Sequence, residues 1–223
     1  MKRFSISRYK SCTYIIISAI WLGSCSTDNF QKLDQRSWEL TWSDEFNGAA
    51  GSSPNPANWS YDVGTGQNGW GNQELQSYTN SPSNIAMDGK GNLVITAIRT
   101  GNLFTSARIK TQGLFAQKYG RFEARIKTPY GPGVWPAFWM MGENINQVGW
   151  PECGEIDILE LRGQQPNTII GTLHGPGYSG GNSINRSYSL INGRFDTDFY
   201  LYAVEWSNCR FVLLVSSTPR IGC

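Results

Sequence analysis

Three acidic residues lie close together in the segment GEIDILE, residues 154–160, and their spacing is the strongest chemical signal in the chain. On a β-strand alternate residues share a face, so Glu155 and Asp157 are expected to point to the same side. Strict alternation would send Glu160 to the opposite side. One extra residue, a β-bulge around Ile158–Leu159, would return all three acids to one face, and bulges commonly redirect side chains beside active sites.

The predicted separation of Glu155 and Glu160 fits a two-step substitution at an acetal carbon. With the bulge their Cα atoms would be ~13 Å apart, and the inward-leaning side chains would leave ~5 Å between the carboxyl groups. At that spacing one carboxylate can attack while the other group donates a proton, whereas single-step inversion needs a wider gap. The alternative is a solvated acidic strand face, which the absence of Lys and Arg between Gly142 and Leu161 disfavours.

Eight of the nine tryptophans follow residue 24. Four of the eight stand in segments with Gly, Asn or Pro close by, where their rings can line a cleft and stack on sugar rings. These four are Trp70, Trp135, Trp139 and Trp150. Another three, Trp42, Trp59 and Trp206, are predicted to pack in the core instead.

The elements expected to carry these residues are β-strands. From Trp38 onward, short alternating or β-branched runs are separated by turn residues at roughly 8–12-residue spacing, with no helical periods between them. No internal repeat is present. The pattern predicts an all-β fold, a single antiparallel sandwich over residues 38–223.

Residues 1–24 have the features of an export signal. Four basic residues among the first ten are followed by the apolar run Tyr14–Trp21 and by LGSC at 22–25. The run is too short to cross a bilayer core of ~30 Å. LGSC resembles a bacterial lipobox, which predicts a lipidated Cys25, a tether over residues 25–37 and a membrane-anchored lipoprotein at the cell surface or in the periplasm. The alternative is an ordinary signal cleaved nearby and a secreted protein.

The composition excludes several kinds of site. His174 is the only histidine, so a zinc site built from several histidines is excluded. Residues 25–223 hold 15 basic and 17 acidic side chains, too few positive charges for a duplex nucleic-acid surface. The few cysteines do not form a disulfide framework, so the core must stabilise the domain. We expect a monomer.

Six ordered blocks of sequence give the chain a family resemblance. They are WSDEF (42–46), GNQELQSYT (71–79), SARI (106–109), GVWPAFW (133–139), GEIDILE (154–160) and TLHG (172–175). Together they resemble glycoside hydrolase family 16, most closely its bacterial laminarinases, which are endo-1,3-β-glucanases with a β-jelly-roll fold. The extra Leu159 is typical of laminarinase-like members, whereas the unbulged motif is associated with lichenases and plant transglycosylases.

The resemblance implies hydrolysis of β-1,3-glucan by double displacement. Glu155 matches the nucleophile, Glu160 the acid/base and Asp157 the residue that orients the pair. The positions that match glucose contacts are Asn72, Arg108, Trp135, Trp139, Trp150 and His174. No cofactor is required, and the structural Ca²⁺ of some relatives has no ligands that can be assigned in this sequence.

Other functions stay open at this point. Within the family the substrate could instead be a mixed-linked β-glucan or a marine galactan. A non-catalytic surface protein could also bind glycans with the same cleft, although binding alone does not need three acids.

The end of the sequence departs from the family pattern. After Trp206 the family usually continues through several more strands, whereas this sequence ends at Cys223. We therefore expect the C-terminal strands of the jelly roll to be missing, which would leave the apolar run Phe211–Val215 without strand partners.

Overall fold

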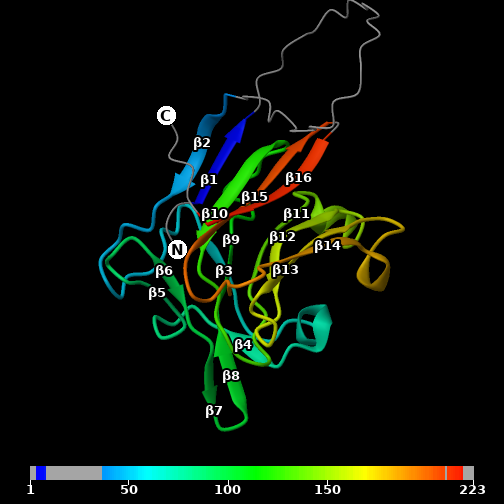
Figure 1. Cartoon of the computed structure of the whole chain (residues 1–223). Helices are drawn as coiled ribbons and strands as arrows, with labels where there is room; N and C mark the ends of the chain where they lie inside the picture. The colour runs from blue at the N-terminus through cyan, green and yellow to red at the C-terminus, as the bar shows by residue number, and fades with distance from the viewer. Residues whose placement is uncertain (1–3, 9–36, 209, 218–223) are drawn as a thin grey trace, which may run out of the picture.

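Strands predominate in the computed structural model, which describes residues 4–8, 37–208 and 210–217. The first large sheet has the order β16–β15–β10–β1–β2, and all its neighbouring strands are antiparallel (Figure 1). Its strands are β1 (Phe4–Arg8), β2 (Glu39–Asp44), β10 (Gly120–Ile126), β15 (Tyr200–Ser207) and β16 (Arg210–Ser216).

The second large sheet has the order β11–β12–β13–β14 and is also antiparallel throughout. Its strands are β11 (Ala137–Met141), β12 (Glu155–Leu161), β13 (Thr168–His174) and β14 (Ile184–Ser189). The acidic segment of the sequence is β12, so it lies between two neighbouring strands in the interior of this sheet.

Smaller sheets and short helices lie in the connections between strands of the large sheets. The pairs are β3 (Ser60–Asp62) with β9 (Arg108–Lys110), β5 (Ile85–Met87) with β6 (Leu93–Ile95), and β8 (Leu103–Ser106) with both β4 (Gln76–Tyr78) and β7 (Ile98–Thr100). The β4–β8 pair is parallel, unlike the purely antiparallel arrangement expected. The helices are η1 (Gly69–Gln73, a π-helix), α1 (Ile145–Val148) and η2 (Gly180–Asn182).

The core lies between the two large sheets. Apolar side chains of β10, β12 and β15 meet there, including Phe122, Leu159 and Val204. Gly171 on β13 faces β16 so closely that a Cβ at this position would overlap Leu213 Cδ1. The sheets therefore pack face to face, which confirms the predicted β-sandwich.

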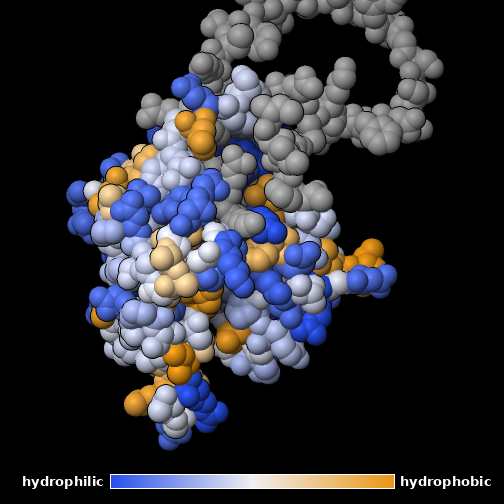
Figure 2. Space-filling model, turned by 90° about the vertical axis from the view of Figure 1, so that its left-hand side faces the viewer, coloured by the Kyte–Doolittle hydropathy of each residue, from blue (hydrophilic) through white to orange (hydrophobic). Residues whose placement is uncertain are grey.

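The surface seen in Figure 2 carries hydrophobic side chains in small separate groups among hydrophilic ones. The β7–β8 hairpin projects at the lower end of the molecule in Figures 1 and 2. Among the predicted core tryptophans, Trp59 is buried, and Trp42 and Trp206 pack against the core while staying partly exposed.

β16 corrects one expectation about the C-terminal segment. Residues Arg210–Ser216 pair with β15 along their whole length, so the expectation that Phe211–Val215 lacks strand partners is wrong on that side. Pairing with β15 supplies partners for backbone N–H and C=O groups of this run. Within the described residues β16 is the outer strand of its sheet.

The predicted export signal overlaps a strand of the fold. Phe4–Arg8 form β1, which pairs with β10 on one side and β2 on the other. Residues 9–36, which hold the rest of the signal, Cys25 and nearly all of the tether, lie outside the described residues. No helix in the described part of the chain is long and apolar enough to cross a membrane.

Candidate active site

A β-bulge in β12 gathers the three acids, as the sequence predicted. Asp157 pairs with Thr172 on β13, and Glu160 pairs with Ile170, so β12 has two residues where β13 has only Gly171. The two residues of the bulge, Ile158 and Leu159, are buried in the core. Without the bulge, Glu160 would face the core and could not join the other acids.

Indole N–H groups hold the two outer carboxylates. Trp150 Nε1 donates to Glu155 Oε2 at 2.6 Å, and Trp135 Nε1 donates to Glu160 Oε1 at 3.1 Å. Thr172 Oγ1 donates to the other oxygen of Glu160 at 2.8 Å. The sequence predicted both indoles as sugar contacts; the structure brings them to the acids, with about half of each residue exposed (51% for Trp135 and 46% for Trp150).

Asp157 is the buried member of the three acids, with 4% of its surface exposed. Burial, followed by the charges of Glu155 and Glu160, raises the pKa of this carboxyl well above its usual range. The protonated carboxyl can donate a hydrogen bond to Glu155, with which it is hydrogen-bonded. Its Oδ2 atom is buried and accepts no hydrogen bond within the described residues.

His174 faces that buried oxygen from β13. Its Nε2 lies 3.4 Å from Asp157 Oδ2, which is long for an ion pair. Its Nδ1 accepts a hydrogen bond from the Gly180 backbone N–H at 3.1 Å. Because Nδ1 is an acceptor, a neutral ring carries its proton on Nε2, toward Asp157. His174 also lies beside Trp150, at 5.8 Å between ring centroids. The predicted sugar-contacting histidine is thus a neighbour of the acid cluster.

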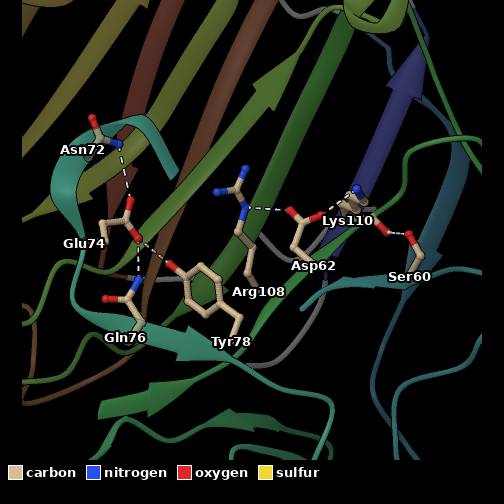
Figure 3. Close-up of polar contacts among 8 residues, drawn as sticks. All are labelled: Ser60, Asp62, Asn72, Glu74, Gln76, Tyr78, Arg108 and Lys110. Atoms are coloured by element: carbon tan, nitrogen blue, oxygen red, sulfur yellow. Dashed lines mark hydrogen bonds and ion pairs between the residues drawn. The ribbon is translucent and has the colours of Figure 1, made fainter. Parts of the chain in front are cut away.

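Arg108 lies between two indoles next to the acid cluster. Its guanidinium carbon is 4.6 Å from the centre of the Trp139 ring and 4.8 Å from that of Trp70. Trp139 on β11 is the strand partner of Asp157, so this stack borders the acids. Asp62 forms ion pairs with Arg108 Nε at 2.9 Å and with Lys110 Nζ at 2.6 Å (Figure 3).

Asn72 belongs to a neighbouring polar group centred on Glu74 (Figure 3). Asn72 Nδ2 donates to Glu74 Oε1 at 3.3 Å, and Tyr78 Oη donates to Glu74 Oε2 at 3.0 Å. Gln76 Nε2 donates to the same oxygen as Tyr78. Burial, together with the Glu74 carboxylate, raises the pKa of Tyr78 to about 12, so the phenol stays a donor.

Sequence reasoning did not single out Asp62, Glu74, Tyr78 or Thr172 as site residues. Glu74, Tyr78 and Thr172 lie inside the family-like blocks, so neighbouring motif residues were a usable signal. Asp62 had none, because its contact with Arg108 depends on the pairing of β3 with β9, strands far apart in the sequence.

Within the described residues, no group of three or more His, Cys, Asp or Glu side chains is arranged to hold a metal ion. The structural Ca²⁺ of some relatives stays a prediction whose ligands are unassigned. Cys153 is a free thiol.

Known proteins are similar to this chain in sequence. The beta-glucanase of Rhodothermus marinus is 40% identical over 198 residues, which is 86% of this chain and 66% of that protein. The glucan endo-1,3-beta-glucosidase of Cryptopygus antarcticus is 41% identical over 180 residues, or 76% of this chain and 63% of that protein. This chain thus spans just under two thirds of the length of these relatives.

A solved structure extends the likeness to three dimensions. The catalytic domain of an endo-1,3-beta-glucanase (laminarinase) from Thermotoga petrophila RKU-1 has a TM-score of 0.73 and 42% identity, covering 82% of this chain and 75% of that chain. Together with the two packed sheets, this confirms the predicted jelly-roll sandwich. The model of the glycosyl hydrolases family 16 matches residues 70–220. With that match over most of its length, the chain belongs to glycosyl hydrolases family 16.

Proposed function

We propose that this protein is an endo-acting, retaining glycoside hydrolase that cleaves laminarin-type β-1,3-glucan by double displacement. The observation that carries the proposal is the bulge in β12, which gathers Glu155, Asp157 and Glu160 on one face. The β-1,3-glucan substrate is proposed from the activities named for the relatives.

The proposed reaction has two steps. Glu155 attacks the anomeric carbon and forms a covalent glycosyl-enzyme, while Glu160 protonates the leaving glycosidic oxygen. Glu160 then removes a proton from water, which attacks the same carbon, releases Glu155 and restores the original configuration. Neither step needs a cofactor.

The hydrogen bonds around the acids suit these different roles. Trp150 and the protonated Asp157 both donate toward Glu155, which fixes the orientation of the attacking carboxylate. Glu160 is held by a separate pair of donors, Trp135 and Thr172. Because each glutamate has its own donors, one can be displaced by substrate without moving the other.

The deciding experiment is NMR of the earliest products of laminarin digestion. A retaining endo-enzyme releases β-anomeric oligosaccharides of mixed length before mutarotation begins. In parallel, Glu155→Ala should abolish turnover, and azide should restore cleavage of an activated aryl β-glycoside and yield the inverted α-glycosyl azide. α-Anomeric first products, or a Glu155→Ala variant that keeps a tenth of the activity, would refute the proposed mechanism.

The same digestion tests the alternatives. Preferential cleavage of mixed-linked β-glucan or of a galactan would change the substrate but not the mechanism. Tight laminarin binding without any cleavage would identify a surface glycan-binding protein, a role that leaves the three gathered acids without a purpose.

We also propose that the protein is exported as a lipoprotein anchored through Cys25, in the periplasm or at the cell surface, and acts as a monomer. The support is the basic, apolar and LGSC order of residues 1–25. Acyl labelling in a bacterial host should be lost in Cys25→Ser, and a Cys25→Ser protein that remains labelled would exclude this anchor.

A further inference from the structure

The Arg108 side chain is oriented by a residue that lies outside the acid cluster. Asp62 and Arg108 are direct partners across the antiparallel β3–β9 pair. The Asp62 carboxylate is nearly buried, with 11% of the side chain exposed. Its two oxygens bind different cations, Oδ2 contacting Arg108 Nε and Oδ1 contacting Lys110 Nζ.

This contact leaves the outer end of the guanidinium available. Nε is the nitrogen bound to Asp62, and the two terminal Nη atoms point away from Asp62 in Figure 3. Within the described residues neither Nη atom donates a hydrogen bond, and a quarter of the side chain is exposed. The guanidinium carbon lies over the rings of both Trp70 and Trp139. The plane is therefore held by Asp62 and the indoles while its four terminal N–H groups stay free to donate.

The free donors border the acids, because Trp139 is the strand partner of Asp157. A planar donor pair beside an indole face suits a sugar, whose C–H face stacks on the ring while its hydroxyls accept from the guanidinium. If the ion pair served only to stabilise the pairing of β3 with β9, leaving these N–H donors unpaired would add nothing to the stability of the fold.

We propose that Asp62 is a positioning residue for glucan binding, which acts by fixing the direction of the Arg108 Nη donors beside Trp139. The inference rests on the proposed function, since it assumes a glucan in the cleft. Without Asp62, the guanidinium could rotate about its terminal bonds, and ordering it again on binding would weaken affinity.

The test is a double-mutant cycle on laminarihexaose binding, measured by calorimetry in the inactive Glu155→Ala background. Asp62→Ala should raise Kd about 5- to 20-fold, and Arg108→Ala should raise it at least as much. The double variant should bind no worse than Arg108→Ala alone, because Asp62 acts only through Arg108. Asp62→Asn, whose amide oxygen can still accept from Nε, should recover most of the affinity.

Lys110→Met is the matched control, since it removes the second cation from the same carboxylate and keeps the Asp62–Arg108 contact. It should leave Kd within about twofold of the parent. In the active background, Asp62→Ala should raise KM much more than it lowers kcat.

Three results would overturn the proposal: an unchanged Kd in Asp62→Ala, additive losses in the double variant, or a fall in kcat with unchanged KM. Those results leave the proposed function intact if the parent still cleaves laminarin. A parent that neither binds nor cleaves glucan would overturn both.

Discussion

At the scale of single residues, hydrogen-bond donors separate the roles of two glutamates that look equivalent in the sequence. Glu155 receives the Trp150 indole and lies beside protonated Asp157, whereas Glu160 receives the Trp135 indole. Indoles that sequence reasoning assigned to sugar stacking thus also orient the carboxylates. A ring can do both, because its N–H lies at the edge and its apolar surface at the face.

Replacing either indole by Phe keeps an aromatic ring and removes the N–H. Loss of a hydrogen bond to a charged group costs ~1.5–3 kcal/mol, or about 10- to 100-fold in kcat/KM. Trp150→Phe should slow laminarin and activated aryl glycosides alike, since both need Glu155. Trp135→Phe should slow laminarin more, because an activated leaving group needs no proton from Glu160. Steady-state kinetics on both substrates measure this, and identical patterns for the two variants would contradict the assignment of roles.

Asp157→Asn should alter how thermal stability depends on pH. The pKa of Asp157 in the folded chain is raised above its ordinary value of about 3.9. Its contribution to the free energy of unfolding is therefore fully present below that value and is lost as the pH rises through the folded-state pKa. Asn has no such proton, so the Tm of the variant relative to wild type should increase with pH across this window. Calorimetry from about pH 4 upward tests it, and parallel curves would contradict it.

At the scale of elements, the bulged strand is supported from the opposite sheet. Gly171 lies across from the bulge, and a side chain there would meet Leu213. The apolar core therefore sets the position of β13, and β13 in turn supplies Thr172 and His174 to the acids.

Gly171→Ala should lower the free energy of unfolding by ~1–3 kcal/mol through overpacking. Leu213→Ala added to it should recover part of that loss, because it removes the atom that a Cβ would meet. Gly181→Ala is the control, since a Cβ at Gly181 meets no atom within 4 Å. Urea denaturation measures all four chains. If Gly171→Ala has the same free energy of unfolding as Gly181→Ala, the two sheets can move apart without loss of stability, which would contradict the prediction.

At the scale of the whole molecule, a segment near the N-terminus forms an interior strand of the first large sheet. β1 is the one described strand that pairs with β2, and it also pairs with β10. The predicted export signal and this strand use the same residues, 4–8. Cleavage after residue 24 would vacate the position between β2 and β10 and expose two strand edges.

A chain that begins at residue 9 should therefore have a lower Tm than the full chain, and a synthetic peptide of residues 1–10 should restore part of the difference. The same peptide with Ile6→Pro lacks one backbone donor and should restore less. Calorimetry with and without peptide is the measurement. If deletion of residues 1–8 leaves Tm unchanged, these residues are dispensable for the sheet, and their basic and apolar character is explained by export alone.

The sequence by itself determined the all-β class, the sandwich and the bulge that gathers Glu155, Asp157 and Glu160. Each follows from local alternation, because a strand has a period of two and a core excludes charge, so the side of every residue can be read along the chain. The ordered blocks of sequence similarly identified the family.

Only the tertiary structure decided which partners those residues meet. Three features depend on which strands pair and in which register. They are the contact of Asp62 with Arg108, the pairing of β16 with β15 and the position of β1 beside β10. Hydrophobic alternation states which face a residue takes but not which strand lies beside it. That choice depends on the packing of both sheets at once, and so it is made by the whole fold rather than by any local stretch of sequence.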